Sequence, residues 1–261
     1  MPPAHPFDLT GKVTLITGAN SGLGFGFADA IARAGGDMVI WGRREDRNAE
    51  AAERLRAHAV RVHTDAVDVS DEAAQLRGFA RALDAMGRLD GVIANAGFAT
   101  ISSLVDMTLK QYEELQRVAQ HGAFITLREG ARHMVARAKA GDRGGSLIAT
   151  GSLTNFTATA GIGHYAAAKS AVAGLIRTFA LELGPHQIRA NMVCAGLTKT
   201  EMVPFDDAHP LGQAAIAKIP LGHMAEPDEI AGVVVYLLSD AARYHTGDTI
   251  TVDGGRMIYG V

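Results

Sequence analysis

The sequence predicts an α/β fold built on a doubly wound, parallel β-sheet with helices on both faces. Short runs rich in β-branched residues alternate with longer stretches of helical periodicity, and several of the short runs are apolar on both faces. The first run leads through a glycine-rich turn into a helix. Such alternation is typical of right-handed strand–helix–strand units. A chain of 261 residues is long enough for one domain, 1–261, with a sizeable core.

The strands are expected where short apolar runs are bounded by turn residues: 13–17, 37–41, 60–64, 90–95, 145–151, 188–194 and 248–253. The helices are expected at 22–34, 44–58, 71–86, 107–140, 162–184 and 227–239. We divide the domain into a cofactor half at about 10–150 and a catalytic and substrate part at about 151–261. The irregular segment 197–225 is long enough to be a lid, and a variable surface excursion is the alternative.

Composition and charge exclude several classes of protein. The net charge of −3 gives no electrostatic reason to expect binding to nucleic acid or to an anionic membrane. The single cysteine, Cys194, rules out an intrachain disulfide. The N-terminus has no signal-peptide pattern, and no apolar run is long enough to span a bilayer. We therefore expect a cytoplasmic protein.

The turn after the first expected strand reads TGANSGLG, residues 17–24. Its glycines, Gly18, Gly22 and Gly24, allow a tight turn and a close approach of a pyrophosphate to the backbone. The helix that follows offers free N–H groups and the positive end of its dipole. We predict a dinucleotide site here, and the alternative is a helix-entry turn made of small residues. The other candidate contacts in the turn are Asn20, Ser21 and Leu23.

The end of the second expected strand bears on the choice of cofactor. An acidic residue there would suit the ribose hydroxyl of NAD, but Gly42 occupies the position and Arg43 and Arg44 follow it. Two guanidinium groups are suited to the 2′-phosphate of NADP. The pattern favours NADP(H) over NAD(H), and the alternative is a solvated helix start.

Several motifs occur in order along the chain: TGANSGLG (17–24), DVSD (68–71), NAG (95–97), YAAAK (165–169) and IRANMVCAG (188–196), with Ser152 thirteen residues before Tyr165. With this ordered set the chain resembles the classical short-chain dehydrogenase/reductase family over nearly its whole length. The resemblance implies a single Rossmann-type domain with a seven-stranded parallel sheet. It also implies a homotetramer or homodimer, with the long helices at 107–140 and 162–184 in the interface.

The resemblance assigns further cofactor contacts by position. Asp68 would meet the adenine amino group and Val69 would line the adenine pocket. Asn95, Ala96 and Gly97 would pass beside the adenosine ribose. Contacts to the diphosphate and nicotinamide side would come from the segment after the sixth strand: Gly196, Leu197, Thr198 and Thr200.

Tyr165 and Lys169 stand four residues apart, which places them on one face of a helix. A cation held near a phenol favours the phenolate and lowers its pKa, so Lys169 is expected to tune Tyr165 for general acid–base catalysis. In the family the lysine also binds the nicotinamide ribose. Ser152 would donate a second hydrogen bond to the substrate oxygen, and the alternative is an ordinary loop serine. Tyr165 and Lys169 thus belong to both the catalytic and the cofactor-binding set.

Two positions depart from the family. Ala119 stands where the family has an asparagine that helps to hold a proton-relay water. We favour a backbone carbonyl that holds the water alone. The alternatives are replacement by Gln120 or His121, or impaired catalysis. The second departure is Ala195, where the family more often has a proline; it restores a backbone N–H and relaxes φ.

The substrate pocket is expected from segments 97–99, 153–156, 161–164 and 197–211. Its candidate side chains are mostly apolar, as small-molecule pockets generally are: Phe98, Leu153, Phe156, Ile162, His164, Met202, Val203 and Phe205. For His164 a packed or solvated helix residue is the favoured alternative. The ten histidines show no metal-binding spacing, so no metal site is expected.

These observations favour a reversible, NADPH-dependent reduction of a small-molecule ketone to a secondary alcohol. The alternative, suggested by Ala119, is a catalytically impaired or non-enzymatic dinucleotide-binding homologue.

Overall fold

Seven parallel strands form the centre of the fold, in the order β3-β2-β1-β4-β5-β6-β7. The strands are β1 (Val13–Thr17), β2 (Asp37–Gly42), β3 (Val62–Ala66), β4 (Gly91–Ala94), β5 (Gly145–Ser152), β6 (Ile188–Ala195) and β7 (Thr249–Val252). The computed structural model describes residues 5–203 and 205–258. The strand order reverses between β1 and β4, and the crevice outside the carboxyl ends at such a point is where open α/β sheets bind ligands.

The sequence expectations for the strands are confirmed, with small shifts at the ends. The largest shift is in β3, which begins at Val62 because its pairing with β2 starts at Met38 opposite that residue. Arg61, just before it, gives its backbone N–H to the Asp37 carboxylate instead, at 2.8 Å.

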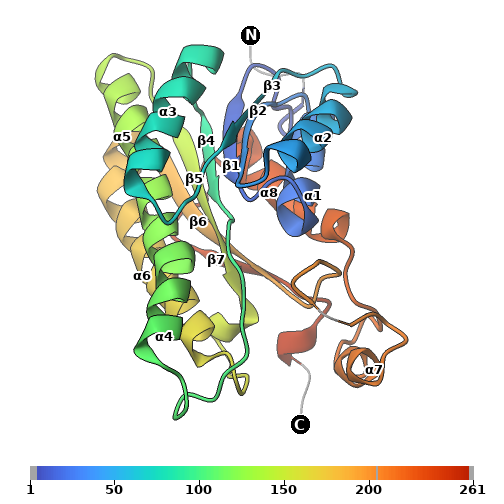
Figure 1. Cartoon of the computed structure of the whole chain (residues 1–261). Coiled ribbons are helices and arrows are strands. Elements are labelled where there is room, and N and C mark those ends of the chain that lie inside the picture. The colour runs from blue at the N-terminus through green and yellow to red at the C-terminus, as the bar shows by residue number, and fades with distance from the viewer. Residues whose placement is uncertain (1–4, 204, 259–261) are drawn as a thin grey trace.

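Helices cover both faces of the sheet (Figure 1). One face carries α1 (Gly22–Arg33), α2 (Glu45–Arg56) and α8 (Pro227–Leu238); the other carries α3 (Glu72–Met86), α4 (Leu109–Gln116), α5 (Ala123–Lys139) and α6 (Gly163–Leu183). Two cores result, one on each side of the sheet. Alternate residues of β1 serve the two cores: Leu15 packs with the α3, α5 and α6 side, and Ile16 with the α1, α2 and α8 side.

The helix expected at 107–140 is interrupted by a π-helical turn. It consists of α4, the π-helix η1 (Arg117–Gly122) and α5. Thr108 caps the start of α4 in a reciprocal capping box with Gln111. The π-turn coincides with a close approach, because a Cβ at Gly122 would lie 2.8 Å from the Val69 carbonyl oxygen. Such turns are frequent at functional sites, and this one contains Ala119.

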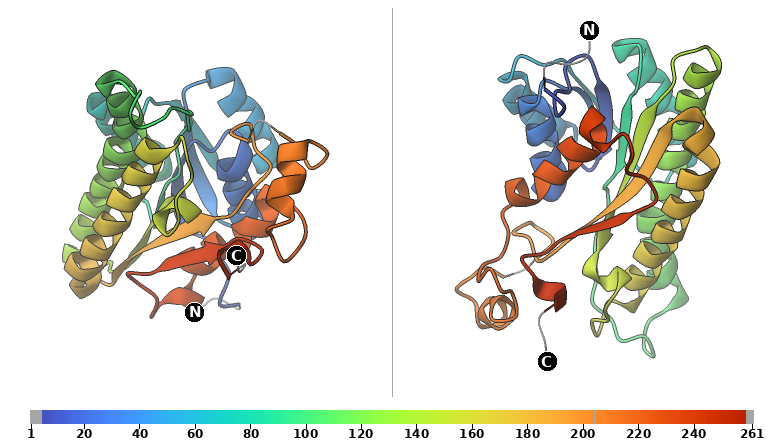
Figure 2. Two further views of the ribbon diagram at one scale, coloured as in Figure 1. Left: turned by 90° about the horizontal axis from the view of Figure 1, so that it is seen from below. Right: turned by 180° about the vertical axis from the view of Figure 1, so that it is seen from behind.

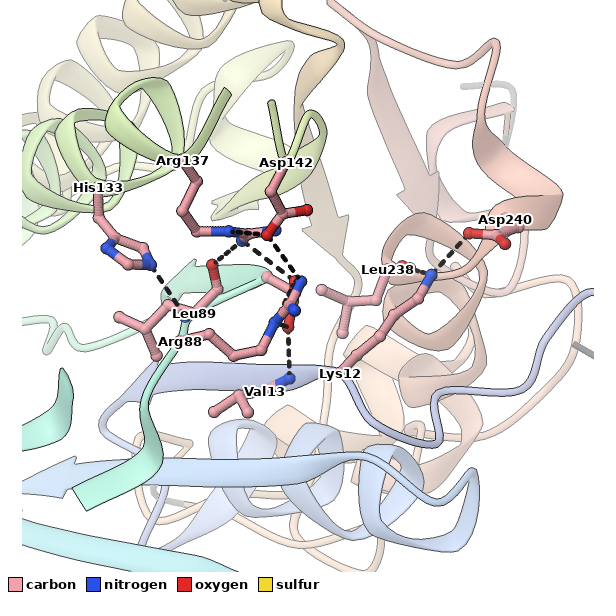
Figure 3. A network of polar contacts seen from close by, with 10 residues as sticks. Lys12, Val13, Arg88, Leu89, His133, Arg137, Asp142, Leu238 and Asp240 are labelled. Atoms are coloured by element: carbon pink, nitrogen blue, oxygen red, sulfur yellow. Dashed lines mark hydrogen bonds and ion pairs between the residues drawn. The ribbon is translucent and has the colours of Figure 1, made fainter. Parts of the chain in front are cut away.

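A polar network fixes the amino-terminal edge of the sheet (Figure 3). The Asp90 carboxylate accepts the backbone N–H of Val13 at 3.0 Å and pairs with Arg88 at 2.6 Å and Arg137 at 3.1 Å. Arg137 also donates to the Leu89 carbonyl at 2.7 Å. These bonds tie the starts of β1 and β4 to α5. They occupy the edge opposite the motif residues, which gather at the carboxyl ends of the strands.

The two ends of the segment expected as a lid lie side by side, and we call this pairing the neck of the lid. Thr198 and Ala225 form an isolated parallel bridge, with hydrogen bonds from Lys199 N to Ala225 O at 2.9 Å and from Ala225 N to Leu197 O at 3.0 Å. Between them the chain leaves the body of the fold and forms α7 (Pro210–Ile216), which the sequence did not predict (Figure 2). Pro204, within this segment, lies outside the described residues.

Among the described residues, no helix has both the length and the apolar character that crossing a membrane requires.

Candidate active site

The glycine-rich turn has the conformation that a dinucleotide cradle needs. Gly18 and Gly22 have positive φ, at 67° and 52°. A side chain at Gly24 would overlap the Gly18 carbonyl oxygen. Ser21 caps α1 without a side-chain hydrogen bond. The turn therefore has no side chains at the three glycines where its backbone would approach a pyrophosphate, and its geometry fits such a group over the start of α1.

A cavity of about 410 Å³ adjoins this turn. It is lined by Asn20, Ser21 and Gly22 of the turn, by Phe25 of α1, and by Arg47, Glu50, Ala51 and Arg54 of α2. The Asn20 amide donates to the buried Asn48 side chain at 2.7 Å, and Asn48 in turn donates to the carbonyl of Gly42 at 3.0 Å. Gly42 is needed here, because any side chain would overlap both asparagines.

The two predicted phosphate-binding arginines lie at the start of α2 and are exposed. Arg43 is close enough to Asp68 for its charge to help lower the pKa of that carboxyl group. Arg44 lies 3.8 Å from Glu201, and Arg47, which the sequence did not single out, also pairs with Glu201. Glu201 belongs to the expected lid, so an acidic side chain of the lid competes for guanidinium groups beside the cavity.

Asp68 and Val69, the residues expected beside the adenine, lie between the end of β3 and the start of α3. Burial favours a higher pKa for Asp68, but hydrogen bonds from the Ser70 backbone and side chain, at 2.9 and 2.8 Å, bring a net decrease. Val69 is buried against the π-turn. Gln75, fully buried, donates to the carbonyls of Val69 and Gly122 at 2.7 and 3.1 Å. Gln75 thereby connects Val69, which is expected to line the adenine pocket, to the π-turn. No sequence motif identified Gln75 as part of the site.

Asn95 connects the glycine turn with the catalytic strand. Its backbone N–H donates to Thr17 Oγ1 at 3.0 Å, and its amide donates to the carbonyls of Thr17 and Gly18. The Thr150 hydroxyl donates to Asn95 Oδ1 at 3.0 Å. Ala96 packs on Gly18, where an added Cβ would lie 3.0 Å from the Ala96 Cα. Gly97 faces Lys169, whose Nζ would lie 3.9 Å from a Cβ at that glycine.

The three candidate catalytic side chains come together at the end of β5 and the start of α6. Lys169 Nζ lies 5.5 Å from the ring centre of Tyr165, so both residues lie on the same side of α6, as their spacing predicts. The Lys169 ammonium donates to the Thr150 carbonyl at 2.6 Å. The Ser152 side chain lies near enough to the Tyr165 phenol to favour its ionised form. Ser152 is the last residue of β5 and caps the following 3-10 turn.

The pKa of the tyrosine differs from the sequence expectation. Burial raises the pKa of Tyr165 above 10.0, and the Ser152 side chain offsets only part of that rise. Burial also lowers the pKa of Lys169 to about 8. The net shift of the tyrosine pKa is therefore opposite to the expected decrease, because the spacing predicts proximity but does not encode the cost of removing both groups from water.

Ala119 packs in a small apolar cluster against the phenol. Leu115, Ala119 and Ala168 are buried together, with Phe98 and Tyr165 packed on them. Ala119 is only 1% exposed, and a methyl group therefore stands buried where the family has the polar asparagine side chain. The π-turn instead changes the hydrogen bonding of the backbone around it.

The expected substrate residues differ in their exposure, and one of them requires a correction. Phe156 and Met202 are 54% and 46% exposed, whereas Phe98, Leu153, Ile162, Val203 and Phe205 are half-buried. His164 is fully buried, and its Nε2 lies 2.8 Å from Thr100 Oγ1. The structure has the packed arrangement for His164, because a side chain without exposed surface cannot contact a substrate.

The segment after β6 brings the remaining cofactor candidates to the glycine turn. Thr200 lies over Gly22, where an added Cβ would be 3.2 Å from the threonine Cγ2. Thr198 is buried, and its hydroxyl donates to the Gly196 carbonyl at 3.0 Å. Leu197 takes part in the neck of the lid. Ala195 ends β6 in regular pairing, opposite Ser152 and Val252.

Comparison with known proteins agrees with this architecture. The sequence profile of a family described as "Enoyl-(Acyl carrier protein) reductase" matches residues 18–256. The chain is 33% identical to L-rhamnose 1-dehydrogenase (NAD(P)(+)) of Azotobacter vinelandii over 256 residues, 96% of this chain and 98% of the relative. It is 33% identical to the NADP-dependent (R)-specific alcohol dehydrogenase of Lentilactobacillus kefiri over 249 residues, 95% and 97% of the two chains.

A solved structure, a short-chain type dehydrogenase/reductase from Mycobacterium marinum, superposes with a TM-score of 0.89 at 33% identity, covering 96% of this chain and 97% of that one. The fold and the site define an oxidoreductase with a Rossmann-type sheet. More particularly, the chain belongs to the classical short-chain dehydrogenase/reductase family.

Proposed function

We propose that the protein is an NADP(H)-dependent oxidoreductase that reduces a small-molecule ketone to a secondary alcohol, reversibly, with Tyr165 as general acid and base. The observation that carries this proposal is the grouping of Ser152, Tyr165 and Lys169 beside Asn95 and Gly97, next to a glycine cradle without side chains. When bound, NADPH would supply the hydride for the carbonyl carbon. Gly18, Gly22, Gly24 and the start of α1 would hold its pyrophosphate, and Arg43 and Arg44 its 2′-phosphate.

The chain's own residues handle the proton. Tyr165 donates its phenolic proton to the carbonyl oxygen as negative charge develops there, and Ser152 donates a second hydrogen bond to that oxygen. A positioned donor of this kind contributes roughly 2–4 kcal/mol to transition-state stabilisation. Lys169, which donates to the Thr150 carbonyl, supplies a positive charge that favours the phenolate and so opposes the effect of burial on the pKa of Tyr165. Because Ala119 carries no polar group, we assign the relay water to a backbone carbonyl of the π-turn.

The preference for NADP(H) is supported by Gly42 and the adjacent arginines. No carboxylate ends β2, and Arg43, Arg44 and Arg47 all lie at the start of α2. An apolar substrate is supported by the exposed apolar side chains of Phe156 and Met202, which belong to the segments expected to form the pocket. A medium-sized, fairly apolar ketone fits these residues best.

The test is a screen of purified protein with NADPH and, separately, NADH against linear, cyclic, steroid-like and sugar-derived ketones, following the absorbance of the reduced nicotinamide. We expect oxidation of NADPH with at least one ketone and slower turnover with NADH. Tight cofactor binding without oxidation across the panel would instead favour the alternative, a dinucleotide-binding homologue whose catalysis is impaired by Ala119.

We also propose assembly into a homotetramer or homodimer through the long helices. Leu109 on α4 and Leu181 on α6 are 70% and 81% exposed, and an interface through these helices would cover them. Sedimentation at several protein concentrations tests this assembly, and a monomer at all of them would contradict it.

A further inference from the structure

We propose that Asn155 is a positioning residue of the active site. Its side-chain amide holds Ser152 and Lys169, which come from two different elements, in the arrangement that proton transfer requires. The proposal rests on the proposed function, in which Ser152, Tyr165 and Lys169 carry the reaction. Asn155 lies in the expected pocket segment 153–156, but no motif assigned a role to its side chain; it follows Ser152 by three residues in a loop rich in small polar residues.

The amide of Asn155 uses both of its ends within the site. Its Oδ1 accepts the backbone N–H of Ser152 at 2.9 Å, and its Nδ2 donates to the backbone carbonyl of Lys169 at 2.8 Å. The buried thiol of Cys194 also donates to Oδ1, at 3.4 Å. One side chain thereby joins the end of β5, the second turn of α6 and the end of β6.

An asparagine fits this position for a definite chemical reason. Ser152 presents a donor and Lys169 an acceptor, and a primary amide supplies one group of each kind on neighbouring atoms. A carboxylate would satisfy the Ser152 N–H but would have no proton for the Lys169 carbonyl. An alanine would leave both backbone groups without this partner.

For catalysis, the important contact of Asn155 is its hydrogen bond with the Ser152 backbone. That backbone is extended, with φ −156° and ψ 159°, and its N–H is held by Asn155. The Thr154 N–H donates to the Ser152 hydroxyl over a long distance, 3.3 Å, and Ser152 also lowers the pKa of Tyr165. Asn155 therefore fixes the backbone from which the Ser152 hydroxyl acts on the phenol. A shift of about 1 Å in a positioned catalytic group can cost on the order of a hundredfold in rate.

The test compares Asn155→Ala with Asn155→Asp and with the control Thr157→Ala. Thr157 lies in the same loop, and its replacement by alanine removes a single side-chain hydrogen bond, to the Leu153 carbonyl at 3.0 Å. We expect kcat to fall on the order of tenfold or more in Asn155→Ala, with NADPH affinity within about twofold. Asn155→Asp keeps the acceptor for Ser152 but loses the donor to the Lys169 carbonyl, so it should recover part of the lost rate, and Thr157→Ala should match the parent.

A double-mutant cycle with Ser152→Ala separates positioning from general damage. If Asn155 acts through the Ser152 hydroxyl, Asn155→Ala should lower kcat by less than about twofold once that hydroxyl is absent. Should the Ser152→Ala background turn over too slowly to measure, the contrast between the Ala and Asp variants decides alone.

Three results would overturn the proposal: a parent-like kcat in Asn155→Ala, equal losses in Asn155→Ala and Asn155→Asp, or the same loss with and without Ser152. The single variant Ser152→Ala guards against confusion with the proposed function. A parent-like rate in Ser152→Ala would contradict the assigned catalysis itself, whereas a large loss there with a parent-like Asn155→Ala would contradict only the positioning role.

Discussion

Replacing Lys169 by methionine should change how the stability of the protein depends on pH. The amine is 4% exposed, and burial lowers its pKa from 10.5 to about 8. That difference is 2.5 units, and at about 1.36 kcal/mol per unit it corresponds to roughly 3 kcal/mol. Because the pKa in the folded state lies below that in the unfolded state, the charged amine opposes folding. The penalty is complete below pH 8 and disappears as the pH rises to 10.5.

The measurement is urea unfolding of the parent and Lys169→Met at fixed protein concentration between pH 7 and pH 10.5. The parent should gain about 3 kcal/mol relative to the variant over this range. Lys218→Met is the matched control, since Lys218 is an exposed lysine just after α7 and lies outside the long helices of the proposed interface. Its stability relative to the parent should stay within about 0.5 kcal/mol throughout. A difference between parent and Lys169→Met that stays constant with pH would refute the burial of this amine.

Three further predictions concern the cofactor and the relay. Arg43→Ala should weaken NADPH binding by roughly tenfold or more and leave NADH almost unchanged, measured by titration of each cofactor; equal losses would contradict a phosphate contact. Glu201→Gln should tighten NADPH binding by about one and a half- to fivefold, since it frees Arg44 and Arg47 from an exposed ion pair; weaker binding would be the opposite outcome. Ala119→Asn should lower stability by about 1–3 kcal/mol through overpacking and raise kcat less than about threefold, whereas a tenfold gain would mean that the backbone relay is incomplete.

The strands and most helices could be predicted because their signals are local. Buried parallel strands such as β1 and β2 are short runs rich in apolar residues, and turn residues bound them. The π-turn could not be predicted, because it coincides with the tertiary contact of Gly122 with Val69. Nor could α7, a short helix of seven residues inside a segment that has three prolines in its sequence.

The motifs selected the residues of the site better than they predicted its energetics. Tyr165 and Lys169 lie as their spacing requires, but burial, which spacing does not encode, sets the direction of both pKa shifts. Burial also decided between the alternatives for His164. Asn155 and Gln75 were missed because their roles depend on hydrogen bonds to backbone groups that are distant in the sequence or belong to other elements.

The most direct test of the account is the turnover of Tyr165→Phe with a ketone that the parent reduces. Phenylalanine keeps the ring that packs with Phe98 and Ala119 but has no proton to donate. We predict a loss in kcat of roughly a hundred- to ten-thousandfold, with NADPH affinity within about threefold of the parent. Reduction of the ketone by Tyr165→Phe at the parent rate would contradict the assignment of the proton donor.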